Sequence, residues 1–143
     1  MSLKILYTAH AAATGGRNGH TQNDNGIVSV DLSIPKVMGG PGKPDTTTPE
    51  DLFAAGYAAC FGSAVDLMAH KLKLVPKSLE IKSAVGLGQN EHGGFGLAVE
   101  MEAHVGGLSQ ADAEKIVAAG HSICPYSNAI KGNVEVTIKV ITT

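Results

Sequence analysis

The sequence has no tryptophan, few aromatic residues (4%) and little excess of either charge, with a formal net charge of -2 at pH 7. Proteins that bind nucleic acid typically present a basic face and aromatic side chains on which bases stack. The charge balance and the scarcity of aromatics therefore argue against a nucleic-acid partner. Glycine is abundant, at 18 of 143 residues, but its spacing is aperiodic, which excludes a collagen-like chain.

A long uninterrupted apolar segment is also missing. The longest apolar run, from Leu52 to Val65, contains 14 residues and is interrupted by Gly56, Gly62 and Ser63. A transmembrane helix needs about 20 apolar residues, and the N-terminus shows no apolar segment followed by a signal-peptide cleavage site. We therefore expect a cytoplasmic protein with no membrane partner.

Cysteine is scarce, because Cys60 and Cys124 are the only two in the chain. In the cytoplasm such cysteines are more often free, catalytic or redox-active than permanently linked. Either residue alone is more often a buried space-filler than a reactive thiol, and the sequence does not place them within disulfide reach. Neither these cysteines nor the six histidines have the clustered spacing of a zinc site, so no metal or other cofactor is expected.

Hydrophobic periodicity predicts the secondary structure. A period of two residues predicts strands at Lys4–Thr14, Gly26–Leu32, Ser78–Gln89, Phe95–Val105 and Asn133–Ile141. Asn18-Gly19 predicts a hairpin turn, and the segment Pro35–Pro49, which holds four of the six prolines, predicts a loop.

Two helices are predicted between these strands. Thr48 as N-cap and Pro49 at the first helical position begin a helix that ends at about Leu72. Ser109 caps a second helix, which ends near Cys124 because the following proline disfavours helical geometry there. The order of elements predicts a single α+β domain over residues 1–143 with mostly antiparallel sheet. The first helix is apolar nearly all round, so we expect it to be buried centrally.

A reactive cysteine in apolar surroundings needs a positive charge, because burial alone disfavours the thiolate. Arg17 is the only arginine, and Glu50 at the start of the first helix could neutralise it if it were buried. Each residue also has an ordinary role, as a solvated turn residue or as a helix N-terminal acid. Glu50 and Cys60 lie ten residues apart, about 15 Å along a continuous helix. A site containing both therefore needs a second chain, unless the helix breaks at Gly56.

Three motifs resemble those of the organic hydroperoxide resistance proteins of the OsmC/Ohr superfamily. They are TGGRNG around Arg17, TPEDLFAAGYAACF around Glu50 and Cys60, and CPYSNA from Cys124. They occur in the expected order and span nearly the whole chain. One departure is Asn18, where the family usually has aspartate.

The resemblance implies an intertwined homodimer, with mostly antiparallel sheets wrapped around long central helices. It further implies a thiol peroxidase that reduces organic hydroperoxides to alcohols. Cys60 is then the peroxidatic cysteine, Cys124 the resolving one, and Arg17 with Glu50 the activating pair. The reductant in this family is a dithiol, typically carried by a lipoylated protein.

Two other functions remain open at the level of the sequence. The same fold could carry a small molecule or lipid while both cysteines are inert. A redox sensor that signals through a disulfide is a further possibility, although no DNA-reading element supports it. The apolar residues Phe53, Tyr57 and Phe61 near Cys60 favour a bulky organic hydroperoxide over hydrogen peroxide as substrate.

Overall fold

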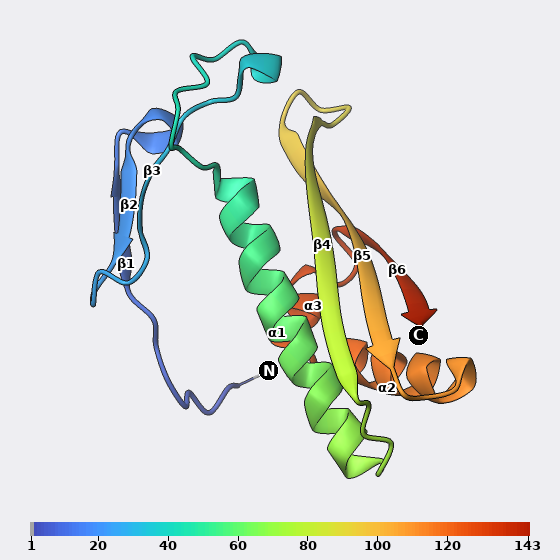
Figure 1. The fold of residues 1–143 in the computed structure, drawn as a ribbon. Coiled ribbons are helices and arrows are strands. Elements are labelled where there is room, and N and C mark those ends of the chain that lie inside the picture. The colour runs from blue at the N-terminus through green and yellow to red at the C-terminus, as the bar shows by residue number, and fades with distance from the viewer. Residues whose placement is uncertain (1) are drawn as a thin grey trace. The chain divides into compact units, whose positions relative to one another are not determined.

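The structure is a computed structural model that describes residues 2–143, and its chain divides into two compact units, Met1–Leu52 and Phe53–Thr143. The sheets and helices of each unit are drawn in Figure 1. In chain order the elements are β1 (Ala11–Thr14), β2 (His20–Asn23), β3 (Ser29–Asp31), α1 (Pro49–Lys71), β4 (Ser78–Gln89), β5 (Phe95–Gly106), α2 (Gln110–Ile123), α3 (Pro125–Ile130) and β6 (Glu135–Thr142), with single 3-10 turns at Gly16–Asn18 and Lys36–Met38.

The first unit contains a three-stranded antiparallel sheet in the order β1-β2-β3. The predicted hairpin forms, with Thr14 opposite His20. Glycine is required at Gly19, because a Cβ there would overlap the carbonyl oxygen of Thr14. The first strand is much shorter than the predicted Lys4–Thr14, and it comprises the alanines Ala11–Ala13 and Thr14 rather than the more apolar residues before them.

Helix α1 begins and ends close to the predicted residues. The Thr48 hydroxyl accepts a hydrogen bond from the backbone N–H of Asp51 at 3.1 Å, as an N-cap does. The helix then runs without a break through Gly56 to Lys71, and Lys73 beyond it adopts a left-handed conformation with φ 57°. The continuity at Gly56 removes the possibility that a break brings Glu50 close to Cys60 within one helix.

The second unit is built on a sheet with strand order β4-β5-β6. Strands β4 and β5 pair antiparallel over their whole length, from Ser78 opposite Gly106 to Gln89 opposite Phe95. The sheets are mostly antiparallel, as expected, but β6 pairs parallel to β5. The reason is the connection, because α2 and α3 carry the chain from the end of β5 back to the level of its beginning, as a parallel pair requires.

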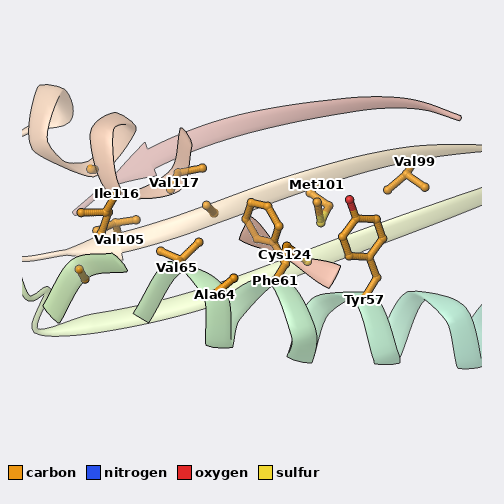
Figure 2. Close-up of a cluster of buried hydrophobic side chains, with 13 residues drawn as sticks. Tyr57, Phe61, Ala64, Val65, Val99, Met101, Val105, Ile116, Val117 and Cys124 are labelled. Carbon is orange, nitrogen blue, oxygen red and sulfur yellow. The ribbon is translucent and has the colours of Figure 1, made fainter. Parts of the chain in front are cut away.

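The hydrophobic core lies between one face of this sheet and the helices α1 and α2, as Figure 2 shows. The sheet contributes alternate residues of β5, and the helices contribute one stripe each. The fully buried large side chains are Tyr57, Phe61, Val65, Val99, Val105, Ile116 and Cys124. Phe95, the first residue of β5, lies outside this core and is 66% exposed.

Helix α1 is not buried all round within the chain. Its buried residues are Tyr57, Phe61, Ala64, Val65 and Ala69, which follow a helical spacing along one side, while Leu67 is 50% exposed. The helix has 23 residues and is long and apolar enough, by length and composition, to cross a membrane. The 14-residue apolar run in the sequence underestimates the length of this helix, because the helix extends beyond that run at both ends. A core helix of a globular protein meets the same criterion.

Candidate active site

The two cysteines lie next to each other in the second unit. Cys60 projects from the middle of α1 and is half-buried, whereas Cys124 is fully buried between α2 and α3. The Cys124 thiol donates a hydrogen bond to the Cys60 sulfur, with 3.7 Å between the two Sγ atoms, and no disulfide links them. The folded structure thus brings together two residues that are 64 positions apart in the sequence.

The backbone around Cys124 explains its position. Cys124 is at once the residue that ends α2 and the residue that precedes α3, with φ -62° and ψ 124°. This extended geometry is what a residue before proline prefers. The sequence correctly predicts that α2 ends here but does not predict α3. Proline disfavours a helix in the residue before it, and it also suits the first position of a new helix.

Burial raises the pKa of the Cys60 thiol above its ordinary value. The backbone N–H of Tyr126 donates toward the sulfur and lowers the pKa, while the neighbouring Cys124 raises it further. Burial and the second thiol outweigh the single N–H donor. None of these influences supplies a positive charge, so these surroundings favour the thiol over the thiolate.

Arg17 and Glu50 form a bidentate ion pair in the first unit. Arg17 Nη1 donates to Glu50 Oε2 at 2.8 Å, and Nη2 donates to Oε1 at 2.6 Å. This geometry matches the planar guanidinium to the carboxylate. The hydrogen bonds from Arg17 hold the pKa of the Glu50 carboxyl below its usual range, and those to Glu50 raise the pKa of Arg17. The Arg17 side chain is 36% exposed, so its guanidinium remains accessible at the surface of this unit.

The loop that carries Arg17 is fixed by its neighbours. Gly15 and Gly16 adopt positive φ angles of 73° and 55°, a conformation that side chains other than glycine rarely adopt. Asn18 accepts a hydrogen bond from the backbone N–H of Ile34 through its Oδ1 at 3.0 Å. An aspartate carboxylate at this position could accept the same bond, so Asn18 preserves one contact that an acid would make.

A buried polar chain beside the cysteines was not predicted from the sequence. Tyr57 Oη lies 2.6 Å from Ser127 Oγ, and Ser127 Oγ lies 2.9 Å from His121 Nδ1. No signal in the sequence connects three residues that reside on three different helices.

Aromatic rings pack around the same residues. The Tyr57 ring lies 6.0 Å from Phe53, 6.2 Å from Phe61 and 5.9 Å from Tyr126, measured between centroids. Tyr57 and Phe61 are fully buried, so they form part of the core, whereas Tyr126 is 40% exposed. Of the aromatic residues predicted near Cys60, only Phe53 is half-buried. Within residues 2–143, no group of three or more His, Cys, Asp or Glu side chains is placed to hold a metal ion.

Comparison with known proteins assigns the chain to a family. Residues 40–139 match the family described as OsmC-like protein. The chain is 48% identical over 136 residues to an organic hydroperoxide resistance protein of Xanthomonas axonopodis pv. citri, covering 94% of each. It is 41% identical over 138 residues to the organic hydroperoxide resistance protein OhrB of Bacillus subtilis, covering 94% of this chain and 98% of OhrB.

Solved structures agree with this assignment. The crystal structure of OhrB from Bacillus subtilis has a TM-score of 0.87 at 39% identity, covering 95% of this chain and 99% of that one. An organic hydroperoxide resistance protein from Legionella pneumophila has a TM-score of 0.91 at 47% identity, covering 96% and 99%. The matches extend over both units of the chain. The chain therefore belongs to the OsmC-like family, among the organic hydroperoxide resistance proteins.

Proposed function

We propose that this protein is a thiol peroxidase that reduces organic hydroperoxides to alcohols through Cys60 and Cys124. The observation that carries the proposal is the 3.7 Å separation of the two sulfurs, one half-buried and the other fully buried. A closing movement of about 1.7 Å brings them to the length of a disulfide bond, about 2.05 Å. The organic hydroperoxide resistance of the relatives supports the choice of substrate.

In the first step, the Cys60 thiolate attacks the outer oxygen of the hydroperoxide. A sulfur–oxygen bond forms and the oxygen–oxygen bond breaks, which leaves Cys60 as a sulfenic acid. The alkoxide departs with the bonding electron pair and takes up a proton to give the alcohol. A guanidinium near the sulfur favours this step twice, because it stabilises the thiolate before the reaction and the developing alkoxide during it.

In the second step, Cys124 condenses with the sulfenic acid to a disulfide and releases water. This step protects Cys60 from further, irreversible oxidation. A dithiol then reopens the disulfide by thiol–disulfide exchange, and we propose a lipoylated protein as its source. We place this cycle in the cytoplasm, where the thiol pool keeps cysteines reduced and ready to react.

We further propose that the Arg17–Glu50 pair acts on the Cys60 of a second chain in an intertwined homodimer. Burial raises the pKa of Cys60, so a cation must reach it for the thiolate to form near neutral pH. Helix α1 is continuous from Pro49 to Lys71, which separates Glu50 from Cys60 by about 15 Å along the axis. Since Arg17 and Glu50 are joined within one chain, the chain that supplies Glu50 also supplies Arg17.

The substrate preference follows from the surroundings of Cys60. Phe53 and Tyr126 are partly exposed aromatic neighbours of the buried Tyr57 ring, and they offer apolar contacts to an alkyl or aryl tail. Hydrogen peroxide has no such tail and gains nothing from them. We expect a larger second-order rate constant with cumene hydroperoxide than with hydrogen peroxide. An equal or larger constant for hydrogen peroxide would contradict this preference.

The proposed chemistry is tested with two cysteine variants of the reduced protein. Cys60→Ser is expected to abolish peroxidase activity, because no sulfenic acid can form at the reacting position. Cys124→Ser is expected to undergo one rapid oxidation and then to turn over poorly with a dithiol, because the disulfide cannot close. Undiminished turnover in Cys60→Ser would refute the assignment. A native protein whose thiols do not react with cumene hydroperoxide would instead indicate a non-catalytic carrier.

The proposed origin of the activating pair is tested with mixed dimers. In the first, a Cys60→Ser chain is combined with a Glu50→Ala chain, so the only intact thiol faces a native Glu50 from its partner. In the second, the Glu50→Ala chain is replaced by an Arg17→Ala chain. Near-normal oxidation in both dimers supports action between chains. Oxidation as slow as in the corresponding Glu50→Ala or Arg17→Ala homodimer would place the pair in the same chain as the thiol.

A further inference from the structure

A chain of hydrogen-bonded side chains connects the surroundings of the cysteines to the surface of the second unit. It consists of Tyr57, Ser127 and His121, with separations of 2.6 Å and 2.9 Å between successive polar atoms. Tyr57 and Ser127 are buried, whereas His121 is half-buried. Both Ser127 and His121 line a cavity of about 350 Å³ between α2, α3 and the beginning of β6. The polar chain therefore has one end in the core and the other at a surface cavity.

The inner end of this chain lies in the buried cluster that contains Cys124 and against which Cys60 packs. Tyr57 precedes Cys60 by three residues on α1, a spacing that places two side chains on the same face of a helix. Burial raises the pKa of the Tyr57 hydroxyl, the hydrogen bond with Ser127 lowers it, and the neighbouring Cys124 and Cys60 raise it further. Tyr57 and Cys124 also belong to the same buried cluster, labelled in Figure 2.

Cys124 has a chemical requirement that its surroundings make difficult. To form a disulfide, its sulfur must attack Cys60 and lose its proton, yet the side chain is fully buried. Solvent does not reach a buried thiol directly, and a bare thiolate in apolar surroundings is disfavoured. The hydrogen bond that Cys124 makes through its thiol goes to Cys60, the reaction partner, which offers no route to solvent.

We propose that Tyr57, Ser127 and His121 form a proton path that serves Cys124 when the disulfide closes. This inference rests on the proposed peroxidase cycle. As the Cys124 sulfur bonds to Cys60, its proton passes to Tyr57 Oη, the Tyr57 proton passes to Ser127 Oγ, and the Ser127 proton passes to His121 Nδ1. The bond between Cys60 sulfur and its hydroxyl oxygen breaks, and the departing hydroxide takes a proton from solvent at the half-exposed Cys60 side. One proton leaves at His121 and one enters at Cys60, so the net products are the disulfide and water.

The chemistry of the three groups suits such a path. Each hydroxyl can donate one hydrogen bond while accepting another, so the chain can point in either direction. A histidine ring nitrogen can be either donor or acceptor, and histidine is the side chain best suited to gain and lose protons near neutral pH. Besides His121, Lys131 is the titratable residue that lines the outer cavity. On α1, the titratable residue in contact with Ser127 is Tyr57 itself. His121 thus stands where a proton can be exchanged with solvent.

The test separates the two steps of oxidation by rapid-quench alkylation and intact mass measurement. The formation of sulfenic acid gives a second-order rate constant, and the conversion of sulfenic acid to disulfide gives a first-order one. We expect Tyr57→Phe, Ser127→Ala and His121→Ala each to reduce the first-order constant by about 100-fold, the lower end of the range for general acid–base catalysis. The second-order constant should change by less than about twofold. Tyr57→Phe keeps the ring that packs in the core, and His121 is only half-buried, so these variants are expected to fold.

Two further measurements distinguish proton transfer from mere positioning. Free imidazole, which has the same ring that His121→Ala removes, should restore disulfide closure in His121→Ala but not in Ser127→Ala. The native first-order constant should fall at least about twofold in heavy water. The matched control is Ser122→Ala, because Ser122 lines the same cavity but its hydroxyl donates to the carbonyl of Ala119 within α2. This control should close its disulfide at the native rate.

Each result has a definite meaning. Unchanged closure in all three variants would overturn the proton path, and so would slow closure with neither rescue by imidazole nor a heavy-water effect. If Ser122→Ala were as slow as Ser127→Ala, the effect would belong to the cavity rather than to the chain, which would also overturn it. Failure of the native protein to form sulfenic acid would refute the proposed peroxidase itself. That outcome is visible in the first step alone, so the two failures are distinguishable.

Discussion

The close approach of α1 and α2 at Gly120 offers a quantitative test of the structure that holds the cysteine pair. A Cβ added at Gly120 would lie 2.6 Å from Val65 Cγ2 and 2.8 Å from both the Val65 Cα and its backbone nitrogen. Carbon atoms in contact normally lie about 3.5–4.0 Å apart, so the helices would have to separate by about 1 Å. The obstacle is backbone, which cannot rotate away as a side chain can.

The magnitude follows from two opposing effects. Overpacking of a core contact costs about 1–3 kcal/mol, and the backbone contact at Gly120 places this substitution at the upper end. Replacing a glycine inside a helix with alanine recovers about 0.5–1 kcal/mol. Gly120→Ala is therefore expected to lower the free energy of unfolding by about 2 kcal/mol. With a urea dependence of about 2 kcal/mol per molar, the unfolding midpoint falls by about 1 M.

The assay is urea unfolding of the reduced protein at one fixed concentration, with Gly62→Ala as the matched control. Gly62 likewise lies inside a helix, α1, but the nearest atom to its added Cβ is Ile81 Cγ1 at 3.4 Å, part of a side chain that can move. This control should match or exceed the stability of the native protein. The reasoning fails if Gly120→Ala is as stable as the native protein, or if both substitutions destabilise it equally. Cys124 follows Gly120 by one helical turn, so Gly120→Ala should also slow disulfide closure.

Three further predictions concern the first helix and the ion pair. Thr48→Ala removes the side-chain acceptor for the Asp51 N–H and should cost about 1 kcal/mol of unfolding free energy in the same urea assay. Arg17→Ala should shift the pH dependence of peroxide oxidation to higher pH, because it removes the proposed cation that offsets the effect of burial on the pKa of Cys60. An unshifted pH–rate profile would contradict this. The pKa of Glu50 is lowered in the folded state, so its contribution to stability is present at neutral pH and is lost as the pH falls through the folded pKa. A Glu50→Gln variant should lack this acid-dependent loss of stability in urea titrations below about pH 5.

Local signals in the sequence predicted the parts of the fold that depend on local chemistry. Thr48 and Ser109 each cap a helix by accepting a backbone N–H three residues later, and both helices begin where these residues predict. Strand β4 has the predicted boundaries and β5 extends one residue further, because an apolar face and a polar face alternate along each strand. Such features require only neighbouring residues.

Features that depend on distant parts of the chain were not predictable in this way. The parallel direction of β6 results from how α2 and α3 return the chain, and nothing within the strand itself indicates it. The same holds for the 3.7 Å approach of Cys60 and Cys124, for which the sequence left both a reactive and an inert pair open.

The Arg17–Glu50 ion pair was predictable in one respect and not in another. The single arginine and the need of a buried guanidinium for a carboxylate suggested Glu50 as the partner of Arg17, and the two side chains are indeed hydrogen-bonded. Their action on Cys60 stays a prediction, because it depends on a second chain. No pattern in the sequence predicts the hydrogen bond between Tyr57 and Ser127.

The unequal burial of the two sulfurs imposes an order on every reaction that involves an outside thiol. Only the Cys60 sulfur is partly open, while Cys124 is fully enclosed. In the proposed cycle, an incoming dithiol that attacks a Cys60–Cys124 disulfide is therefore expected to bond to Cys60, with Cys124 as the leaving group. The mixed disulfide forms at one sulfur alone, so the enclosed thiol is regenerated first and the exposed one last. A bulky alkylating reagent added to the reduced protein should likewise label a single cysteine per chain.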